Sequence, residues 1–186
     1  MPQNLTLYKI FKMFLDHNSH IYRQAINFHK GKEFEEILKN IFDNNSIRYK
    51  YQPNGTQQFP DFLLPDYDIE INIECKTSKN GKIIWNSGFP HSNMILLYAS
   101  NISQANDITF FLGEELVDET TRNNVKRWGR QKNQILKEEF STNFNLPDWD
   151  FYLREMYNWK INNVLRHPRR EQWENNVLMF LHQHAN

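Results

Sequence analysis

The chain has 186 residues, and its 22 basic and 22 acidic side chains give a formal net charge of zero at neutral pH. With 39% hydrophobic and 24% charged residues, the composition is that of a globular domain and excludes a disordered or fibrous chain. No apolar run approaches about 18 residues and the sequence opens without a signal-peptide pattern, so we expect a cytoplasmic protein with no membrane span. The single cysteine, Cys75, excludes a disulfide framework and a cysteine-based zinc site.

The hydrophobic pattern predicts helices at both ends of the chain and strands between them. Apolar residues recur at helical spacing near residues 4–14 and 32–43, and helical patterns return after residue 118. Shorter alternating or apolar segments, bounded by turn-forming residues, indicate strands in the middle. The predicted strands are 47–51, 59–64, 67–76, 94–98 and 109–112, and the predicted later helices are about 118–140, 148–163 and 170–184.

This order of elements predicts an α/β fold with a mixed β-sheet flanked by helices. No internal repeat, low-complexity tract or Gly/Ser linker divides the sequence, so we expect a single domain over residues 1–186. Its core is expected at about residues 31–140, and its C-terminal helices at about 141–186.

One predicted strand alternates polar and apolar side chains and ends in a pair of opposite charges. Glu74 and Lys76 lie two residues apart, so both project from the face that lacks the isoleucines. A hairpin that turns at Tyr67 and Asp68 pairs residues whose numbers have a constant sum. It therefore places Asp61 opposite Glu74. Two convergent carboxylates beside an ammonium group suit a hard divalent cation such as Mg²⁺, which activates an attacking water and binds phosphate oxygens. The alternative is an ordinary solvated face of a half-buried hairpin.

Residues 60–76, which include Asp61, Glu74 and Lys76, resemble the active-site signature of the PD-(D/E)XK nucleases, the fold of most type II restriction endonucleases. The resemblance implies a Mg²⁺-dependent deoxyribonuclease, with Mn²⁺ as a second cation that supports cleavage. It also implies that Asp61 and Glu74 are metal ligands and that Lys76 is catalytic.

Residues 31–35 are similar to the helix that precedes the signature hairpin in that family. A glutamate of this helix often joins the metal site there. The matching residue here is Glu35, which the resemblance therefore implies to be catalytic and metal-binding. Glu33 and Glu36 are the alternative residues for this role, and the alternative with no catalytic role is a solvated helix face.

Polar and basic residues after the signature are candidates for DNA contacts. A loop that follows the signature strand lies near the scissile phosphate by connectivity, and a basic stripe on a helix can follow a phosphate backbone. The candidates are Lys79, Lys82, Asn86 and His91 in the loop, and Arg122, Lys126 and Arg130 on the predicted helix. The alternatives are a structural loop and a solvated helix face balanced by Glu138 and Glu139.

A nuclease site of this type hydrolyses one strand, so a double-strand break needs a second site. Little sequence remains beyond the catalytic core, and zero net charge offers little affinity for DNA. The chain resembles the small cleavage subunit of heterodimeric type IIS restriction endonucleases. That resemblance implies two partners: double-stranded DNA, and a larger subunit that recognises the site and nicks the other strand. We expect a monomer when the chain is alone. The alternatives are a self-sufficient homodimeric restriction or repair endonuclease and a nuclease-fold DNA-binding module without activity.

Overall fold

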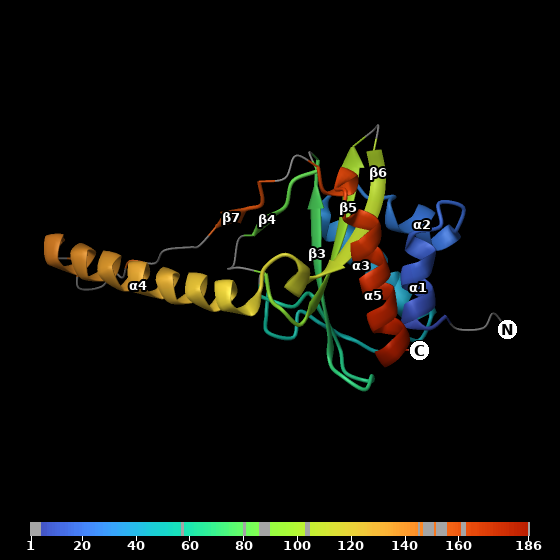
Figure 1. The fold of residues 1–186 in the computed structure, drawn as a ribbon, viewed down its shortest axis with the longest axis horizontal. Coiled ribbons are helices and arrows are strands. Elements are labelled where there is room, and N and C mark those ends of the chain that lie inside the picture. Colours follow the sequence, from blue (N-terminus) through green and yellow to red (C-terminus); the bar gives the residue numbers. More distant parts are fainter. Residues whose placement is uncertain are drawn as a thin grey trace.

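A five-stranded mixed sheet forms the centre of the molecule in the computed structural model (Figure 1). The structure describes residues 5–185 apart from positions 57, 80, 86–89, 103–104, 145, 147–150, 152–155 and 161–162. In spatial order the strands are β1 (Lys50–Tyr51), β2 (Phe62–Leu64), β3 (Ile71–Ser78), β5 (Met94–Ile102) and β6 (Ala105–Leu112). β3 and β5 run parallel, and the other neighbours are antiparallel.

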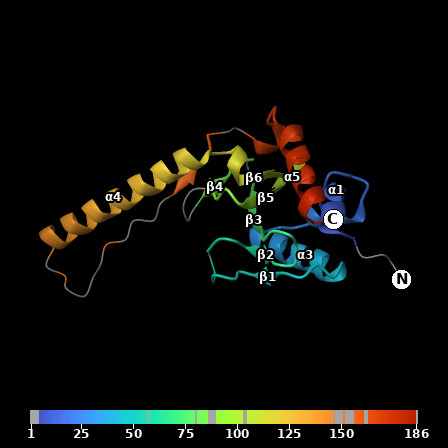
Figure 2. The same cartoon turned by 60° about the horizontal axis from the view of Figure 1, so that its bottom comes forward.

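Helices cover this sheet and extend from it (Figures 1 and 2). They are α1 (Leu7–Phe14), α2 (His20–Ala25), α3 (Gly31–Asn44), α4 (Glu119–Asn143) and α5 (Arg170–His184), with short 3₁₀ turns η1 (Gly113–Glu115) and η2 (Val164–Arg166). No helix among the described residues is long and apolar enough to cross a membrane.

The first three helices bury their apolar faces against one side of the sheet. In α1, Leu7, Ile10, Phe11 and Phe14 follow helical spacing, and all four are fully buried. Side chains of α2 and α3 join the same core, together with the apolar face of β3 that ends at Cys75. This packing fixes α3 against the sheet.

A second, smaller core lies on the other face of the sheet. It contains Trp85, Leu96, Tyr98, Phe111 and Trp173 among others. The core is closed by a two-stranded sheet, in which β4 (Ile84–Trp85) pairs with β7 (Tyr157–Asn158). The face of β3 that carries Glu74 and Lys76 therefore points toward this second core.

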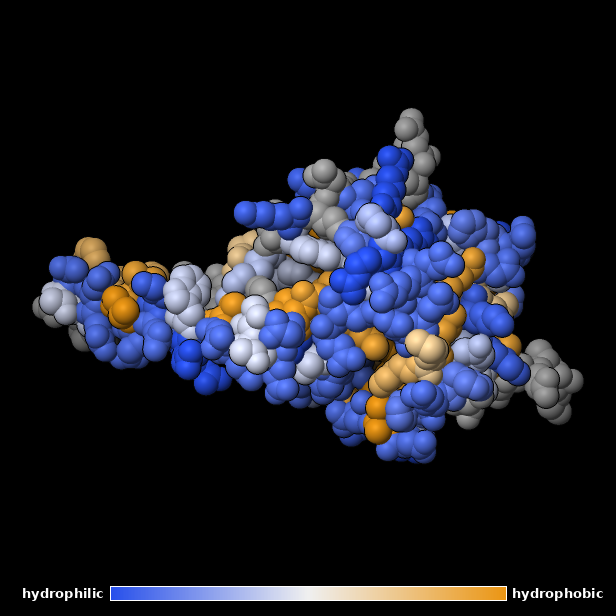
Figure 3. All heavy atoms as spheres, viewed as in Figure 1, coloured by the Kyte–Doolittle hydropathy of each residue, from blue (hydrophilic) through white to orange (hydrophobic). Residues whose placement is uncertain are grey.

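The long helix α4 projects away from the five-stranded sheet, and β7, which follows it in the chain, lies back beside β4 (Figures 1 and 2). At 25 residues it is about 37 Å long. Among its residues only Arg122 and Gly129 are buried. Figure 3 shows this projection as a largely hydrophilic surface with hydrophobic patches, and Trp128 and Ile135 are 54% and 46% exposed.

The structure confirms the predicted mixed sheet flanked by helices, and the helices predicted over residues 32–43, 118–140 and 170–184. The strand predicted over 47–51 is only two residues long. The strands predicted over 59–64 and 67–76 begin later, at Phe62 and Ile71, because the residues before them form bends. The six-residue helix α2 was not predicted.

The helix predicted over residues 148–163 is wrong in the part that the structure describes. Tyr157 and Asn158 form a strand, because their backbones pair with Trp85 and Ile84. Residues 148–150, 152–155 and 161–162 of that prediction lie outside the described residues.

Candidate active site

The antiparallel hairpin of β2 and β3 carries the predicted signature. Its register pairs Phe62 with Ile73, and extending that offset by one residue sets Asp61, just before β2, opposite Glu74. The register expected from the sequence is therefore confirmed. Asp61 lies just before β2, and its Oδ2 accepts a hydrogen bond from the backbone N–H of Cys75 at 2.7 Å. This bond holds the Asp61 carboxylate beside Glu74.

Glu74 and Lys76 form a close ion pair on β3. The Lys76 Nζ donates to Glu74 Oε1 at 2.7 Å and lies 5.5 Å from the centre of the Trp85 ring. Glu74 is only 9% exposed, and its other oxygen, Oε2, is buried with no hydrogen-bond partner in the described part of the chain. Buried polar atoms are almost always paired, so an unpaired carboxylate oxygen marks a place for a ligand.

The alternative of a solvated hairpin face is wrong for this strand. Every residue of β3 from Ile71 to Cys75 is buried, on both faces of the sheet. The polar face is covered because the second core, with Trp85, packs on that side.

Glu35 is the glutamate of α3 that the fold brings toward Asp61. The first turn of α3 lies so close to β3 that a Cβ on Gly31 would meet Thr77 Oγ1 at 2.7 Å. The Tyr51 hydroxyl donates to Glu35 Oε2 at 2.6 Å. The charge of Glu35 acts on the carboxyl of Asp61 and helps to raise its pKa.

The two alternative glutamates have other partners. Glu33 Oε2 accepts the backbone N–H of His29 at 2.7 Å, at the start of α3. Glu36 forms an ion pair with Lys39 at 3.0 Å on the surface of the helix. The geometry therefore favours Glu35 over both.

Negative charge at this site exceeds the positive charge that Lys76 supplies. Burial, and then the charge of Glu74, raises the pKa of the Asp61 carboxyl to about 7. The hydrogen bond from Cys75 and the ammonium of Lys76 lower the pKa of Asp61 but do not offset these effects. A bound cation would relieve this repulsion.

Cys75 lies between these charged residues in sequence but does not share their chemistry. Its side chain belongs to the first core, on the opposite face of the sheet. Burial raises the pKa of the Cys75 thiol well above its ordinary value, and the nearby carboxylates raise it further. The thiol therefore stays protonated and is not a nucleophile.

The donor set fits a cation that completes its coordination with water and substrate. No three His, Cys, Asp or Glu side chains of the described residues are grouped as a full metal site. Mg²⁺ typically binds through one or two carboxylates and keeps several waters or substrate phosphate oxygens. Asp61 and Glu74, with the unpaired Glu74 Oε2, meet that smaller requirement.

The predicted loop contacts that the structure describes lie in different environments. Lys79 and Lys82 are exposed beyond the end of β3, and Asn86 lies outside the described residues. The His91 ring stacks on Phe59 with 3.9 Å between ring centres. Burial lowers the pKa of His91 to about 4, as do the nearby charges of Lys126 and Arg122. The imidazole is therefore neutral at pH 7.

The predicted stripe on α4 is wrong at Arg122. That guanidinium is 3% exposed and donates to the carbonyl oxygens of Pro90 and Val117, so it ties α4 to the body of the protein. Helical spacing identifies residues that share a side but not whether that side faces the protein. Lys126 is half-buried and Arg130 is exposed.

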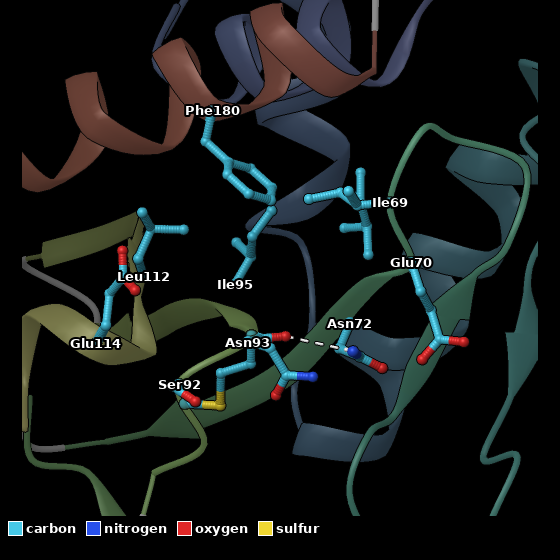
Figure 4. A pocket seen from close by; sticks show the side chains of 11 residues that line it. Ile69, Glu70, Asn72, Ser92, Asn93, Ile95, Leu112, Glu114 and Phe180 are labelled. Atoms are coloured by element: carbon cyan, nitrogen blue, oxygen red, sulfur yellow. Dashed lines mark hydrogen bonds between the residues drawn. The ribbon is translucent and has the colours of Figure 1, made fainter. Parts of the chain in front are cut away.

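A pocket of about 230 Å³ lies near the starts of β3 and β5. Figure 4 shows Phe180 and Ile69 close to Ile95 at the pocket, with Asn72 and Asn93 below them. The Asn72 amide donates to the Asn93 carbonyl at 3.3 Å. None of the predicted catalytic residues lines this pocket, so it is separate from the candidate site.

Sequence reasoning missed Tyr51, because a tyrosine in a predicted strand carries no signal of its own. Only the fold brings its hydroxyl to Glu35.

The chain matches no protein-family model, no curated protein and no solved structure. Its function must therefore be inferred from the arrangement of Asp61, Glu74, Lys76 and Glu35.

Proposed function

We propose that the chain is a Mg²⁺-dependent endonuclease of the PD-(D/E)XK type that hydrolyses one strand of duplex DNA. The β2–β3 register carries this proposal, because it sets Asp61 opposite a Glu74 whose Oε2 is buried and unpaired. Lys76 completes the set at 2.7 Å from Glu74 Oε1. A hairpin with only a structural role gains little from burying two carboxylates together, because desolvation and repulsion both oppose it.

Asp61 and Glu74 would hold the divalent cation, and Glu35, which is not grouped with them in this structure, would have to turn toward them to join it. When bound, that cation polarises the scissile phosphate and lowers the pKa of the attacking water. The ammonium of Lys76 offsets negative charge that develops on the phosphoryl oxygens. Its bond to Glu74 and its position over Trp85 fix it before substrate arrives, so little reorganisation is needed during the reaction.

The chain is proposed to act as a cleavage subunit beside a larger partner that recognises the DNA sequence, as in a type IIS restriction enzyme. Its zero net charge supports this, because neutralising phosphates supplies most non-specific affinity for DNA. Lys126 and Arg130 on α4, with Lys79 and Lys82 beyond β3, offer cationic contacts of modest strength. A partner that holds the duplex raises the local DNA concentration at such a weak site.

The nuclease proposal is tested with two aspartates of one hairpin. Asp61 and Asp66 both follow a proline, but the Asp66 carboxylate pairs with Arg48 at 3.0 Å on the surface. With micromolar protein and Mg²⁺, we expect wild type and D66N to nick supercoiled DNA slowly and without sequence preference. D61N should lose at least about 100-fold in rate. Equal nicking by D61N and D66N would overturn the assignment.

The partner proposal is tested on a duplex with its two strands labelled differently. Together with a sequence-recognising larger chain, the protein should cut one defined strand while the partner cuts the other. If the isolated chain cuts both strands at a specific palindrome, the homodimeric endonuclease replaces this proposal.

A further inference from the structure

Two segments of this neutral chain contain basic residues and no acidic ones. Residues 75–106 include three lysines, and residues 156–170 include one lysine and three arginines, whereas neither segment has an aspartate or a glutamate. Because the whole chain has equal numbers of acidic and basic residues, its charges are unevenly distributed along the sequence. Positive charge is concentrated wherever these two segments meet in the fold.

The two segments lie side by side at the small two-stranded sheet. β4 pairs with β7 (Figure 1), and the Trp159 N–H donates to the Ile83 carbonyl at 3.2 Å. Extending the β4–β7 register by two residues sets Lys82 opposite Lys160, and both are exposed. Like charges directly across a strand pair oppose its formation, so an anionic ligand over this pair would be favourable.

The same contact brings two arginines to this surface. The Val164 N–H donates to the Gly81 carbonyl at 2.9 Å, which joins η2 to the loop that follows β3. Arg166 is the last residue of η2, and the Arg169 guanidinium lies 5.8 Å from the centre of the Trp173 ring. Both arginines are exposed. Their positive charges therefore face solvent beside the lysines of the loop.

Nearby acidic residues reduce this positive charge without cancelling it. The charge of Arg169 acts on Glu115, whose carboxylate already accepts two hydrogen bonds, and Glu171 is exposed in the first turn of α5. Arg170 is matched within the fold, because two carboxylates accept its N–H groups at 2.7 Å. The exposed cations that remain in the two segments, which we call the basic surface, are Lys79, Lys82, Lys160, Arg166 and Arg169.

The basic surface adjoins the candidate site. Trp85 of β4 lies against Lys76, with 5.5 Å between Nζ and the ring centre. Lys79 directly follows β3 and is about 10 Å from Lys76 along an extended strand, which corresponds to about three base pairs of a duplex. A phosphate bound at the basic surface would therefore lie within a few base pairs of one bound at Lys76.

We propose that the basic surface binds the phosphate backbone of duplex DNA beside the scissile phosphate. This inference rests on the proposed function and names the surface that holds its substrate. Each phosphate that the surface neutralises releases counterions, so affinity falls as salt rises. Phosphate contacts position a duplex but carry no sequence information, so the surface acts equally on any sequence.

The test measures binding of a short fluorescent duplex to the full chain in EDTA over a range of salt concentrations. Replacing Arg166 and Arg169 together with Gln should weaken binding about 10- to 100-fold and reduce the slope of log affinity against log salt by about 2. The matched control replaces Lys9 and Lys12 with Gln. These exposed lysines are also three residues apart, but they lie on α1, which packs on the other face of the sheet. The control should bind as wild type does.

A second variant covers the case in which loss of Arg169 from the Trp173 ring prevents folding. Replacing Lys79 and Lys160 with Gln leaves that ring contact intact and should also reduce the salt slope by about 2. The two double variants combined should reduce the slope by about 4, because their phosphate contacts are separate.

The outcomes separate this inference from the proposed function. Equal affinities and slopes in wild type, both double variants and the control would overturn the role of the basic surface alone. An equal loss in the Lys9 and Lys12 control would also overturn it, because any exposed cation would then serve. If the wild-type chain binds with the expected slope and losses but does not cut DNA in Mg²⁺, the proposed function fails, and the basic surface remains a DNA-binding surface without hydrolysis.

Discussion

The β2–β3 hairpin and the helix α4 both carry charged residues, but their surroundings differ. In the hairpin, Asp61, Glu74 and Lys76 form bonds of 2.7 Å with one another or with the backbone. In α4, Arg122 is the buried charge, and the helix otherwise presents its charges at or near the surface. Charges in a low-dielectric interior interact strongly, whereas exposed charges mainly attract distant counter-charges. The contrast predicts chemistry at the hairpin and modest DNA affinity along the helix.

The largest expected effect is at Lys76. Lys76→Gln removes the ammonium beside Glu74 but keeps a side chain of similar length. We expect the single-turnover cleavage rate to fall by about 10²- to 10³-fold, because charge on the phosphoryl oxygens is no longer offset. The affinity for a short duplex should change little. An unchanged rate with weakened binding would make Lys76 a phosphate anchor.

Arg122 tests whether a basic residue of α4 stabilises the fold when it is buried, in contrast to an exposed basic residue of the same helix. Arg122→Met breaks the hydrogen bonds to Pro90 and Val117, and we expect a loss of about 2–4 kcal/mol in the free energy of unfolding. Arg127→Met is the control. Arg127 is an exposed residue of the same helix, and its substitution should cost less than about 0.5 kcal/mol. Denaturant unfolding of both variants checks this, and equal losses would contradict the structural role of Arg122.

Lys126 and Arg130 should contribute to DNA affinity without taking part in chemistry. The charge of Lys126 acts on His91, and the His91 ring stacks on Phe59, which is two residues before Asp61 in sequence. Replacing both residues with Gln should weaken duplex binding about 10-fold. It should also reduce the slope of log affinity against log salt by about 1 to 2.

The control for that pair is Lys132→Gln, because Lys132 projects from a different side of the same helix. It should change the salt slope less than either single substitution at Lys126 or Arg130. Equal slopes in all variants and wild type would remove α4 from the DNA-binding surface.

The charge repulsion at Asp61 predicts a pH dependence of stability in EDTA. The pKa of Asp61 is about 7 in the folded chain against an ordinary value of 3.8, so the folded chain keeps a proton that the unfolded chain releases. The free energy of unfolding should therefore fall as pH rises from about 4 to 7.

His91 contributes in the opposite direction, because its pKa of about 4 lies below the ordinary value of 6.5. The difference between D61N and wild type isolates the Asp61 contribution. D61N should gain at least about 1 kcal/mol relative to wild type between pH 5 and pH 7.5. Parallel stability curves for the two proteins would contradict the repulsion at this site.

The hairpin was predictable from the sequence because its constraints are local. A strand period of two residues and a short turn together set the register, so the pairing of Asp61 with Glu74 follows once the turn is placed. The helices α1, α3 and α5 were predictable for a similar reason, since each carries its own apolar face.

Features that depend on distant parts of the chain were not predictable. The strand at Tyr157 exists because it pairs with Trp85, a contact that no local pattern encodes. In the sequence, Arg122 is part of a basic stripe on a helix. In the fold, its guanidinium instead donates to the carbonyl groups of Pro90 and Val117, which are contacts that the helical spacing does not encode. The bond from Tyr51 to Glu35 likewise joins a strand to a separate helix.

The central claim is that Glu74 and its neighbours form one metal-dependent hydrolytic site. The most direct measurement is single-turnover cleavage of a strand-labelled duplex in Mg²⁺ by Glu74→Gln and by Glu70→Gln, an exposed glutamate that immediately precedes β3. We expect Glu70→Gln to cut like wild type and Glu74→Gln to lose at least about 100-fold in rate, with both proteins folded. Cleavage by Glu74→Gln at the wild-type rate would contradict the claim.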